Sequence, residues 1–259
     1  MTIYYDLPAA EYHSRPEISK SGLDKIAQYP ALYLAHKNRP PQPAEELVIG
    51  QATHTLTLEP DKFEQEFIVA PSGMDRRTKE GKAAFAQLEE SGKQILSFSQ
   101  YELISGMALS VRSNTTALDL ISGGHAEVSF DAILEGVPTR GRCDYLRPDG
   151  VVIDLKTTKS ASPRGFRKSV ADYRYHVQAA IYTDLLEANG LFVPEFIFIA
   201  VEKTYPYAAA IYKLDQEALD VGRSLYQRDL ALYKHCVEMD DWPAYPEEVI
   251  TLSLPTWAM

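Results

Sequence analysis

The sequence predicts an α/β (α+β) fold, in which a central mixed β-sheet is flanked by helices. The apolar pattern changes from helical spacing to strand character near residue 126 and returns to helical spacing near residue 173. The expected helices include 44–58, 99–120 and 173–188, and the expected strands are 126–134, 137–146, 151–157, 194–203 and 207–214. Because no internal repeat occurs, we expect one domain over residues 1–259: an N-terminal helical arm (1–45), a core (46–214), and a C-terminal helix with an extended tail (215–259).

Composition places the chain among cytoplasmic proteins with a sizeable core. Apolar residues make up 45% of the 259 positions, and no stretch approaches the roughly 20 apolar residues of a membrane span. The start does not resemble a signal peptide, so we expect no membrane association. Two cysteines, Cys143 and Cys236, exclude a disulfide framework and cannot supply the four ligands of an iron–sulfur cluster.

The net charge of −10 argues against a surface that binds phosphate broadly, because such affinity comes from lysine and arginine. It leaves room for nucleic-acid binding in a confined groove. Basic residues cluster locally at Arg76, Arg77, Lys79 and Lys82, at Arg140 and Arg142, and at Lys156, Lys159, Arg164, Arg167 and Lys168.

Caps and prolines set the expected ends of the N-terminal helices. Ser19 or Ser21 suits the N-cap of a short helix over 22–28, which Pro30 would stop. The prolines of residues 39–43 predict a rigid connector, and Glu59-Pro60 would end the helix over 44–58.

The remaining helices are assigned in the same way. Residues 78–90 predict a surface helix, and the helix over 99–120 would end at Gly123-Gly124. Asn189-Gly190 is a C-terminal signal for the helix over 173–188. Asp215 suits the cap of a last helix that reaches about Val237, and the tail from Trp242 predicts an extended arm.

Turn chemistry sets the register of the first two central strands. Glu135-Gly136 suits a two-residue hairpin loop, which pairs Leu134 with Val137. Counting back along both strands places Glu127 opposite Asp144.

The next loop extends this row to a third strand. Pro148-Asp149-Gly150 suits a three-residue loop with glycine in the left-handed position, which pairs Arg147 with Val151. Asp144 then lies opposite Asp154, and Lys156 shares the face of Asp154 because side chains alternate along a strand.

Three carboxylates in one row raise one another's pKa unless a cation compensates them. A hard divalent ion with oxygen ligands is an effective compensation, and we prefer a metal site to a solvated acidic face. A metal bound by carboxylates, together with a lysine, supplies the groups that phosphodiester hydrolysis needs. A site for calcium alone is less suitable, because the positive charge of Lys156 would repel the bound cation.

Two helical features have both a functional and an ordinary interpretation. Gln178 and Tyr182 are four residues apart and share one helix face, as an active-site pair or a core-edge pair would. From its position alone, His54 fits a hydrogen-bonded core residue as well as a metal ligand.

The motifs together resemble the RecB-like branch of the PD-(D/E)xK nuclease superfamily. Residues 12–23 (YHSRPEISKSGL) and 54–60 (HTLTLEP) are similar to nucleases of the exonuclease VIII (RecE) type, and the match extends from near residue 10 to beyond residue 180. Each motif is weak alone, and the ordered set is specific. It comprises Gly50-x-x-x-His54, Glu127, Gly141-Arg-Cys-Asp144, Ile153-Asp-Leu-Lys156-Thr-Thr and Gln178-x-x-x-Tyr182.

This resemblance implies a restriction-endonuclease-like core and Mg²⁺, with Mn²⁺ as a substitute, bound by His54, Asp144, Asp154 and the Leu155 carbonyl. It also implies that Lys156 is the catalytic lysine, that Gln178 and Tyr182 orient lysine or substrate, and that Glu127 assists metal or water. Cys143 stands where the superfamily has proline, and Asp154 where glutamate is common, which puts the metal geometry in doubt and not the reaction class.

The same resemblance implies processive degradation of the 5′-ended strand of linear double-stranded DNA, leaving 3′ tails for a RecT-like annealing protein. A homo-oligomeric ring, acidic outside and basic in its channel, would reconcile the net charge with DNA binding. The alternatives are a RecB-like nuclease that acts on single strands or internally, and a DNA-binding module without catalysis.

Several residues are candidate DNA or phosphate contacts. Ser19, Lys20 and Ser21 begin a helix, where backbone N–H groups favour anions, although an ordinary cap explains them equally well. Arg140 and Arg142 alternate with Asp144 and so share its face. Lys159 belongs to the basic cluster that follows the last acid of the row.

Overall fold

The computed structural model describes residues 1–39, 44–74 and 77–255. The proline-rich connector expected at residues 39–43 therefore lies, apart from Arg39, outside the described residues, as does Arg76. Within the described ranges, no helix is long and apolar enough to cross a membrane.

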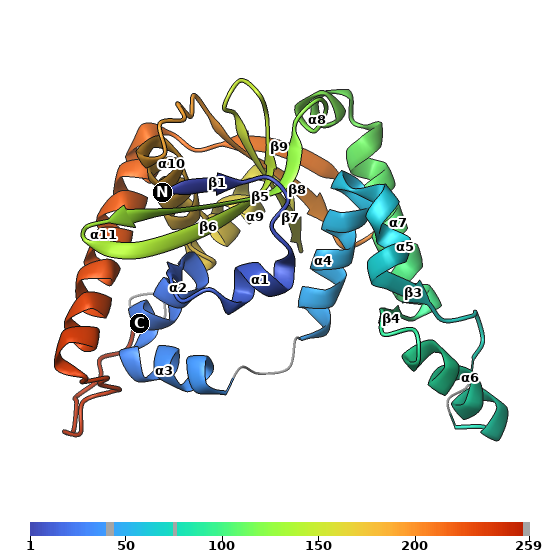
Figure 1. Ribbon diagram of the computed structural model, residues 1–259, viewed down its shortest axis with the longest axis horizontal. Coiled ribbons are helices and arrows are strands. Elements are labelled where there is room, and N and C mark those ends of the chain that lie inside the picture. The colour runs from blue at the N-terminus through green and yellow to red at the C-terminus, as the bar shows by residue number, and fades with distance from the viewer. Residues whose placement is uncertain (40–43, 75–76, 256–259) are drawn as a thin grey trace.

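A mixed sheet forms the centre of the molecule, as predicted (Figure 1). Its strands run in the order β1-β5-β6-β7-β8-β9, and the short β2 pairs with β6. Antiparallel pairing joins β5 to β6, whereas β7 and β8 are parallel. The strands are β1 (Thr2–Tyr4), β2 (Ile18–Ser19), β5 (His125–Leu134), β6 (Val137–Leu146), β7 (Val152–Thr158), β8 (Phe196–Glu202) and β9 (Ala209–Lys213).

The two predicted loops explain why the central strands take this register. Glu135 and Gly136 both have positive φ angles, as a two-residue loop that follows the strand twist requires. Leu134 pairs with Val137, which confirms the first register. In the second loop, Arg147 N–H donates to the Val151 carbonyl at 3.0 Å, which confirms the second.

Helices cover both faces of the sheet, because successive side chains of each strand point to opposite sides. On β8, Phe198 packs with the helices of the first core and Ile199 with those of the second. The first core contains residues of α2 (Lys20–Gln28), α9 (Pro163–Asp172), α10 (Tyr175–Ala188) and α11 (Gln216–Met239). The second contains residues of α4 (Glu45–Leu58), α5 (Pro60–Glu66), α7 (Phe98–Ser113) and α8 (Thr115–Leu120).

An arm projects from the second core at the lower right of Figure 1. It carries the parallel strands β3 (Phe67–Val69) and β4 (Gln94–Leu96) and the helix α6 (Lys79–Glu89). The helix was predicted over 78–90, but the strand pair was not, because three-residue strands carry too little pattern to be recognised.

Several expected boundaries were wrong. Pro30 does stop α2, but it also begins α3 (Pro30–Asn38), because proline fits the first turn of a helix. In the same way Pro60 begins α5. The helix predicted over 99–120 is two helices, because the Asn114 side chain accepts the Ala117 N–H and starts α8. The helix α9, and α1 (Ala9–Ser14) in the N-terminal segment, were missed.

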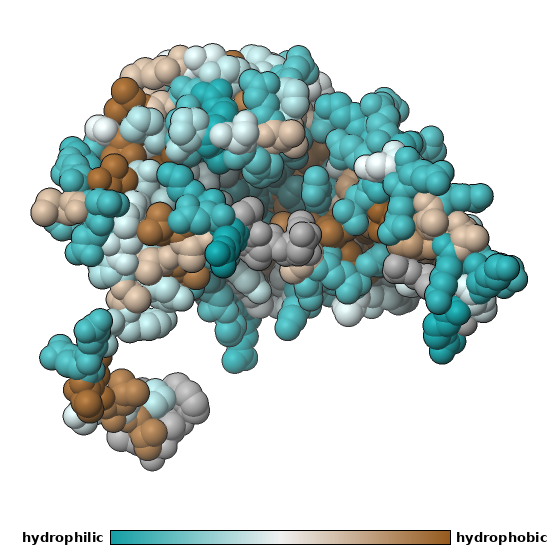
Figure 2. Space-filling view, turned by 60° about the horizontal axis from the view of Figure 1, so that its bottom comes forward, coloured by the Kyte–Doolittle hydropathy of each residue, from teal (hydrophilic) through white to brown (hydrophobic). Residues whose placement is uncertain are grey.

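The C-terminal region follows the prediction closely. Asp215 caps α11 by accepting the Ala218 N–H at 2.9 Å. Beyond this helix the chain is extended, and Trp242 stacks on Tyr33 of α3. Apolar residues farther along, such as Leu252, are exposed, and Figure 2 shows this segment standing away from the body at the lower left.

Candidate active site

A cleft of about 790 Å³ lies where β6 and β7 separate. Its walls are α4, α5, α10 and the N-terminal segment around α1. Eight of the predicted site residues line it, apart from those at the start of α2: His54, Glu127, Arg142, Asp144, Leu155, Lys156, Gln178 and Tyr182.

Asp144 lies at the fork between two strands. The ladder between β6 and β7 contains only the pairs Tyr145–Ile153 and Leu146–Val152, after which β7 continues along β8. Asp144 Oδ2 accepts the Leu155 N–H at 2.7 Å and so occupies the place of a further backbone partner. The carboxylate is therefore held at the open end of the ladder.

Glu127 reaches the same place through a local break in β5. Its φ angle of 52° is left-handed, and the β5–β6 ladder skips it while the pairs on either side keep the predicted register. A side chain in this conformation costs roughly 1–2 kcal/mol, which neighbouring structure must offset. The result is that ligand atoms of His54, Glu127 and Asp144 all lie within 4.8 Å of one another.

His54 is fixed against Asp144 on the outer side of this group. Its Nδ1 lies 3.3 Å from Asp144 Oδ2. Burial lowers the pKa of His54, but the neighbouring Asp144 carboxylate outweighs this and raises the pKa to about 9. The histidine therefore contacts a carboxylate of the cluster, as a metal ligand or a hydrogen-bonded histidine would.

Asp154 and Lys156 form a second pair, in which the carboxylate is buried and the lysine lines the cleft. Asp154 is completely buried, and its Oδ1 lies 2.5 Å from Lys156 Nζ. Oδ1 is nevertheless a buried atom without a partner in hydrogen-bond geometry. The other oxygen, Oδ2, accepts from Gln178 Nε2 at 2.5 Å. Gln178 thus contacts the site directly, whereas Tyr182 packs edge-on against Phe130 and lines the cleft at the margin of the core.

The carboxylates do perturb one another, although not uniformly. Burial and the Asp144 carboxylate raise the pKa of Glu127 to about 7 and that of Asp154 to about 6. Asp144 departs from the sequence expectation: its pKa is lowered, because the opposing effect of burial is outweighed by His54, Lys156 and the Leu155 N–H. Burial would also neutralise Lys156, but Asp154 and Asp144 raise its pKa.

The donor set fits a divalent cation. Two carboxylates and a histidine converge within 4.8 Å, and Asp154 follows on the next strand, β7. The grouping differs from the predicted ligand set, because Glu127 joins His54 and Asp144 while Asp154 is turned toward Lys156 and Gln178. Leu155 lines the cleft and uses its N–H on Asp144.

The predicted phosphate contacts at the start of α2 are mostly engaged locally. Ser19 caps the helix by accepting the Gly22 N–H at 3.3 Å, which is the ordinary interpretation. Lys20 pairs with Asp24 at 2.8 Å and donates to the Tyr173 carbonyl. Ser21 lines the cleft.

The arginines of β6 divide between the cleft and the N-terminal segment. Arg142 lines the cleft, lies 3.6 Å from Glu127 Oε2 and donates to the Leu7 carbonyl. Arg140 donates to the Arg15 carbonyl instead and does not line the cleft. Lys159 is exposed and also lies outside the cleft lining.

Two tyrosines of the site were missed from the sequence. The Tyr12 ring lies 4.4 Å from the Arg142 guanidinium carbon and 5.0 Å from that of Arg140. Lys156 Nζ lies 4.7 Å from the centre of the Tyr175 ring. The spacing of Tyr175 three residues before Gln178 places both on one helix face and could have indicated the second tyrosine.

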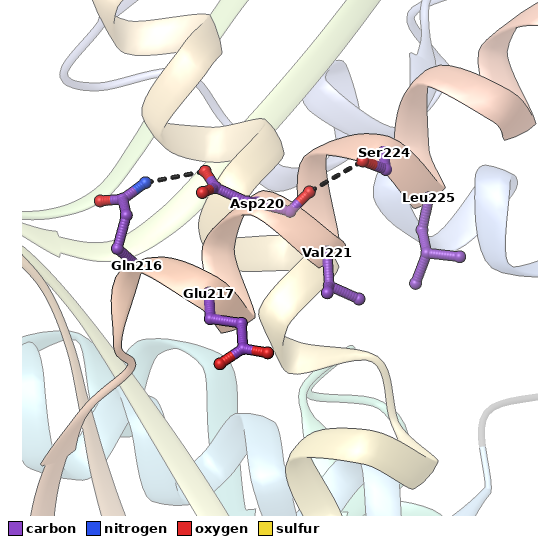
Figure 3. A pocket seen from close by; sticks show the side chains of 6 residues that line it. All are labelled: Gln216, Glu217, Asp220, Val221, Ser224 and Leu225. Atoms are coloured by element: carbon purple, nitrogen blue, oxygen red, sulfur yellow. Dashed lines mark hydrogen bonds between the residues drawn. The ribbon is translucent and has the colours of Figure 1, made fainter.

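A separate hollow of about 570 Å³ lies on the outer surface of α11, near its start. Figure 3 shows its six lining side chains, all from this helix: Gln216, Glu217, Asp220, Val221, Ser224 and Leu225. It is shallow and holds no cluster of metal-ligating groups among the described residues. The cluster of metal-ligating groups lies instead in the cleft at β6 and β7.

Comparisons with known proteins identify the family and the fold of the chain. The chain matches the family model described as a PDDEXK-like domain of unknown function (DUF3799) over residues 19–254. A candidate exonuclease from Eubacterium rectale has a similar structure, with a TM-score of 0.67 at 14% identity over 98% of this chain and 97% of that chain. At this identity the likeness shows the fold alone. No curated protein matches the chain.

A phage-related exonuclease from Haemophilus somnus 129PT shares 12% identity over 89% of this chain and 99% of that chain. Its TM-score of 0.38 is too low to carry an argument. Since the family model covers most of the sequence, the chain belongs to the PDDEXK-like domain family (DUF3799), and its mixed sheet flanked by helices is the PD-(D/E)xK nuclease fold.

Proposed function

We propose that this protein is a Mg²⁺-dependent exodeoxyribonuclease that degrades the 5′-ended strand of linear double-stranded DNA. The observation that carries the nuclease proposal is the buried Asp154–Lys156 pair beside the converging group His54, Glu127 and Asp144. The strand polarity rests on the resemblance of the motifs to nucleases of the RecE type. The Eubacterium rectale neighbour is named a candidate exonuclease, and that name is compatible with the proposed exonuclease activity.

His54, Glu127 and Asp144, with Asp154 adjacent, would hold the cation. A divalent metal in such a site supplies Lewis acidity and lowers the pKa of a bound water. Asp154 holds the Lys156 ammonium in place at 2.5 Å, and Gln178 fixes the other carboxylate oxygen. Because Lys156 keeps its proton, it can stabilise negative charge that grows on a phosphate oxygen, in a site shielded from water.

Arg142 is the best-placed cation of the cleft for a second phosphate contact. It lines the cleft and is held by Ser129 Oγ at 2.7 Å and by the Leu7 carbonyl. Its guanidinium is therefore fixed before substrate arrives, which lowers the entropy cost of binding. Ser21, which lines the cleft, and the exposed Lys159 outside its lining remain candidate phosphate contacts.

The reaction would leave 3′ single-stranded tails for strand annealing, and a RecT-like annealing protein is the expected partner. A homo-oligomeric ring would surround the duplex and keep the enzyme on its substrate. The oligomeric state is measured by sedimentation of the purified protein, with and without a short duplex. A protein that stays monomeric in both would exclude the ring.

The nuclease proposal is tested by digesting end-labelled linear duplex DNA in Mg²⁺, in Ca²⁺ and in EDTA. Duplexes with 5′-phosphorylated and with blocked ends are compared, and Asp154→Asn is the matched inactive control. We expect loss of the 5′-ended strand only in Mg²⁺. Internal cuts, or cleavage of single strands alone, would overturn the substrate, and binding without cleavage in any metal would favour a non-catalytic DNA-binding module.

A further inference from the structure

A short turn between α9 and α10 places the exposed Tyr173 next to Tyr175, which lines the catalytic cleft, while Tyr173 itself lines a neighbouring hollow of about 550 Å³. Tyr173 is 61% exposed, and its ring stacks on that of Tyr175 with centroids 5.6 Å apart and planes at 25°. Tyr175 in turn stacks at 28° on the buried Phe198 and lies under Lys156 Nζ. The three rings form one stack that leads from the core, past the lysine of the site, to the surface.

The turn that carries Tyr173 is held in place unusually firmly. The next residue, Arg174, has a left-handed φ angle of 55° and an ion pair with the fully buried Asp229. Lys20 Nζ donates to the Tyr173 carbonyl at 2.8 Å. An exposed aromatic ring on a fixed backbone loses little entropy when a flat partner covers it.

Each of the four cations near the ring has a carboxylate partner. Lys168 pairs with Asp172 at 2.7 Å, Lys20 with Asp24, and both Arg174 and Arg228 with Asp229. A phosphate would therefore gain little here, because attraction to a phosphate backbone depends on unpaired cations. A ligand at this surface would therefore bind mainly by stacking on the exposed face of the Tyr173 ring.

We propose that Tyr173 stacks against an unpaired nucleobase of the DNA strand whose phosphates pass Lys156. The inference rests on the proposed nuclease function and names a binding subsite for that substrate. A base covering the outer face of Tyr173 would continue the existing ring stack by one layer. Stacking of this kind tolerates every base, as an enzyme that degrades DNA regardless of sequence needs.

The test uses a short duplex with an unpaired 5′ end that carries 2-aminopurine at one position at a time. Fluorescence and affinity are measured with Ca²⁺ in place of Mg²⁺, and gel analysis checks that the strand stays intact. We expect quenching at one unpaired position with the wild-type protein and with Tyr173→Phe, which keeps the ring. Tyr173→Leu should lose this quenching and bind roughly 5-fold to 100-fold more weakly.

Salt dependence separates stacking from phosphate binding. Because the lost interaction is uncharged, the fold-weakening in Tyr173→Leu should be the same at about 50 mM and about 200 mM salt. Tyr205→Leu is the matched control, since Tyr205 is 86% exposed and its ring contacts Tyr207, which does not line the cleft. We expect this variant to bind as the wild type does.

The outcomes distinguish this inference from the proposed function. If the wild type degrades DNA in Mg²⁺ and Tyr173→Leu binds and quenches like the wild type, the stacking subsite is wrong and the nuclease proposal stands. Weakening that disappears at the higher salt would also overturn stacking. If the wild type neither binds nor cleaves DNA, both proposals fail.

Discussion

Two clusters of buried charged residues in this protein differ in how their carboxylates are compensated. In the first, which we call the Asp229 cluster, each carboxylate pairs with two basic side chains. In the second, the catalytic cluster, three carboxylates lie together and part of their compensation is a histidine. The Asp229 cluster is Lys20, Asp24, Arg174, Arg228 and Asp229, and the catalytic cluster is His54, Glu127, Asp144, Asp154 and Lys156.

This difference in charge compensation indicates a different role for each cluster. Asp229 is completely buried and both of its oxygens meet arginines, so its charge is compensated by the fold itself. In the catalytic cluster, Glu127 and Asp154 have raised pKa values, because burial and the neighbouring Asp144 carboxylate both oppose their charge. A bound cation would compensate these carboxylates, whereas Asp229 of α11 already pairs with Arg174 at the start of α10 and with Arg228.

The largest expected effect is on activity, from Lys156→Met. Removing the ammonium should lower the cleavage rate about 10²-fold to 10³-fold, because it removes a charge placed to stabilise the transition state. Single-turnover cleavage of end-labelled duplex measures it. The control is Lys213→Met, because Lys213 lies on β9, pairs with Glu195 and is outside the cleft lining. Wild-type rates in Lys156→Met would refute the assignment of the catalytic lysine.

The largest expected effect on stability comes from Asp229→Asn. Breaking this buried pair leaves two arginines facing an uncharged group and should lower the free energy of unfolding by about 3–5 kcal/mol. Urea denaturation measures it, and the folded fraction should keep its cleavage rate. Asp220→Asn is the control on the same helix, where an exposed pair with Arg223 should cost under about 1 kcal/mol. Equal losses in both variants would contradict the distinction between the clusters.

A pH effect should distinguish the metal-free from the metal-bound protein. The raised pKa of His54, about 9, contributes stability that is fully present below about pH 6.5 and is lost as pH rises through 9. Glu127, with its pKa near 7, acts in the same direction between about pH 4.5 and 7. In EDTA we therefore expect melting temperature to fall from pH 6 to pH 9.

Added Mg²⁺ should reverse this fall, because the cation replaces the proton of His54 and compensates the charged carboxylates. The rise in melting temperature on adding Mg²⁺ should then be larger at pH 9 than at pH 6, by about 1–2 kcal/mol in stability. Scanning calorimetry in Mg²⁺ and in EDTA measures both series. A rise of the same size at both pH values would exclude metal binding at this cluster.

The smallest expected effect is from Glu127→Gln. Removing one of the adjacent like charges should stabilise the metal-free protein by about 0.5–1 kcal/mol and reduce the stabilisation by Mg²⁺. Chemical denaturation in EDTA and in Mg²⁺ tests this prediction. The neighbouring Glu135→Gln, in the hairpin loop and outside the cleft, is the control. A less stable metal-free Glu127→Gln would mean that Glu127 is already compensated.

Local chemistry in the sequence was sufficient to place the carboxylate row. Loop length and glycine position set hairpin register, and register sets which side chains meet across a sheet. Both predicted registers were confirmed, and with them the neighbourhood of Glu127, Asp144 and Asp154. The mixed sheet flanked by helices followed from the same periodicity. The short elements β1, β2, β3, β4 and α1 did not, because they are stabilised by their tertiary partners and not by their own pattern.

Only the tertiary structure decided how the charges are shared. No local rule indicates that Glu127 leaves the ladder with a positive φ angle, or that Asp154 turns to Lys156 and Gln178 while Glu127 joins His54. The same holds for Arg140, which donates to the N-terminal segment, and for the ring stack ending at Tyr173. The sequence by itself determined which residues share a face of the sheet, because that depends on neighbours along the chain. Which partner each side chain takes depends on groups brought together from distant positions, and only the folded molecule contains those contacts.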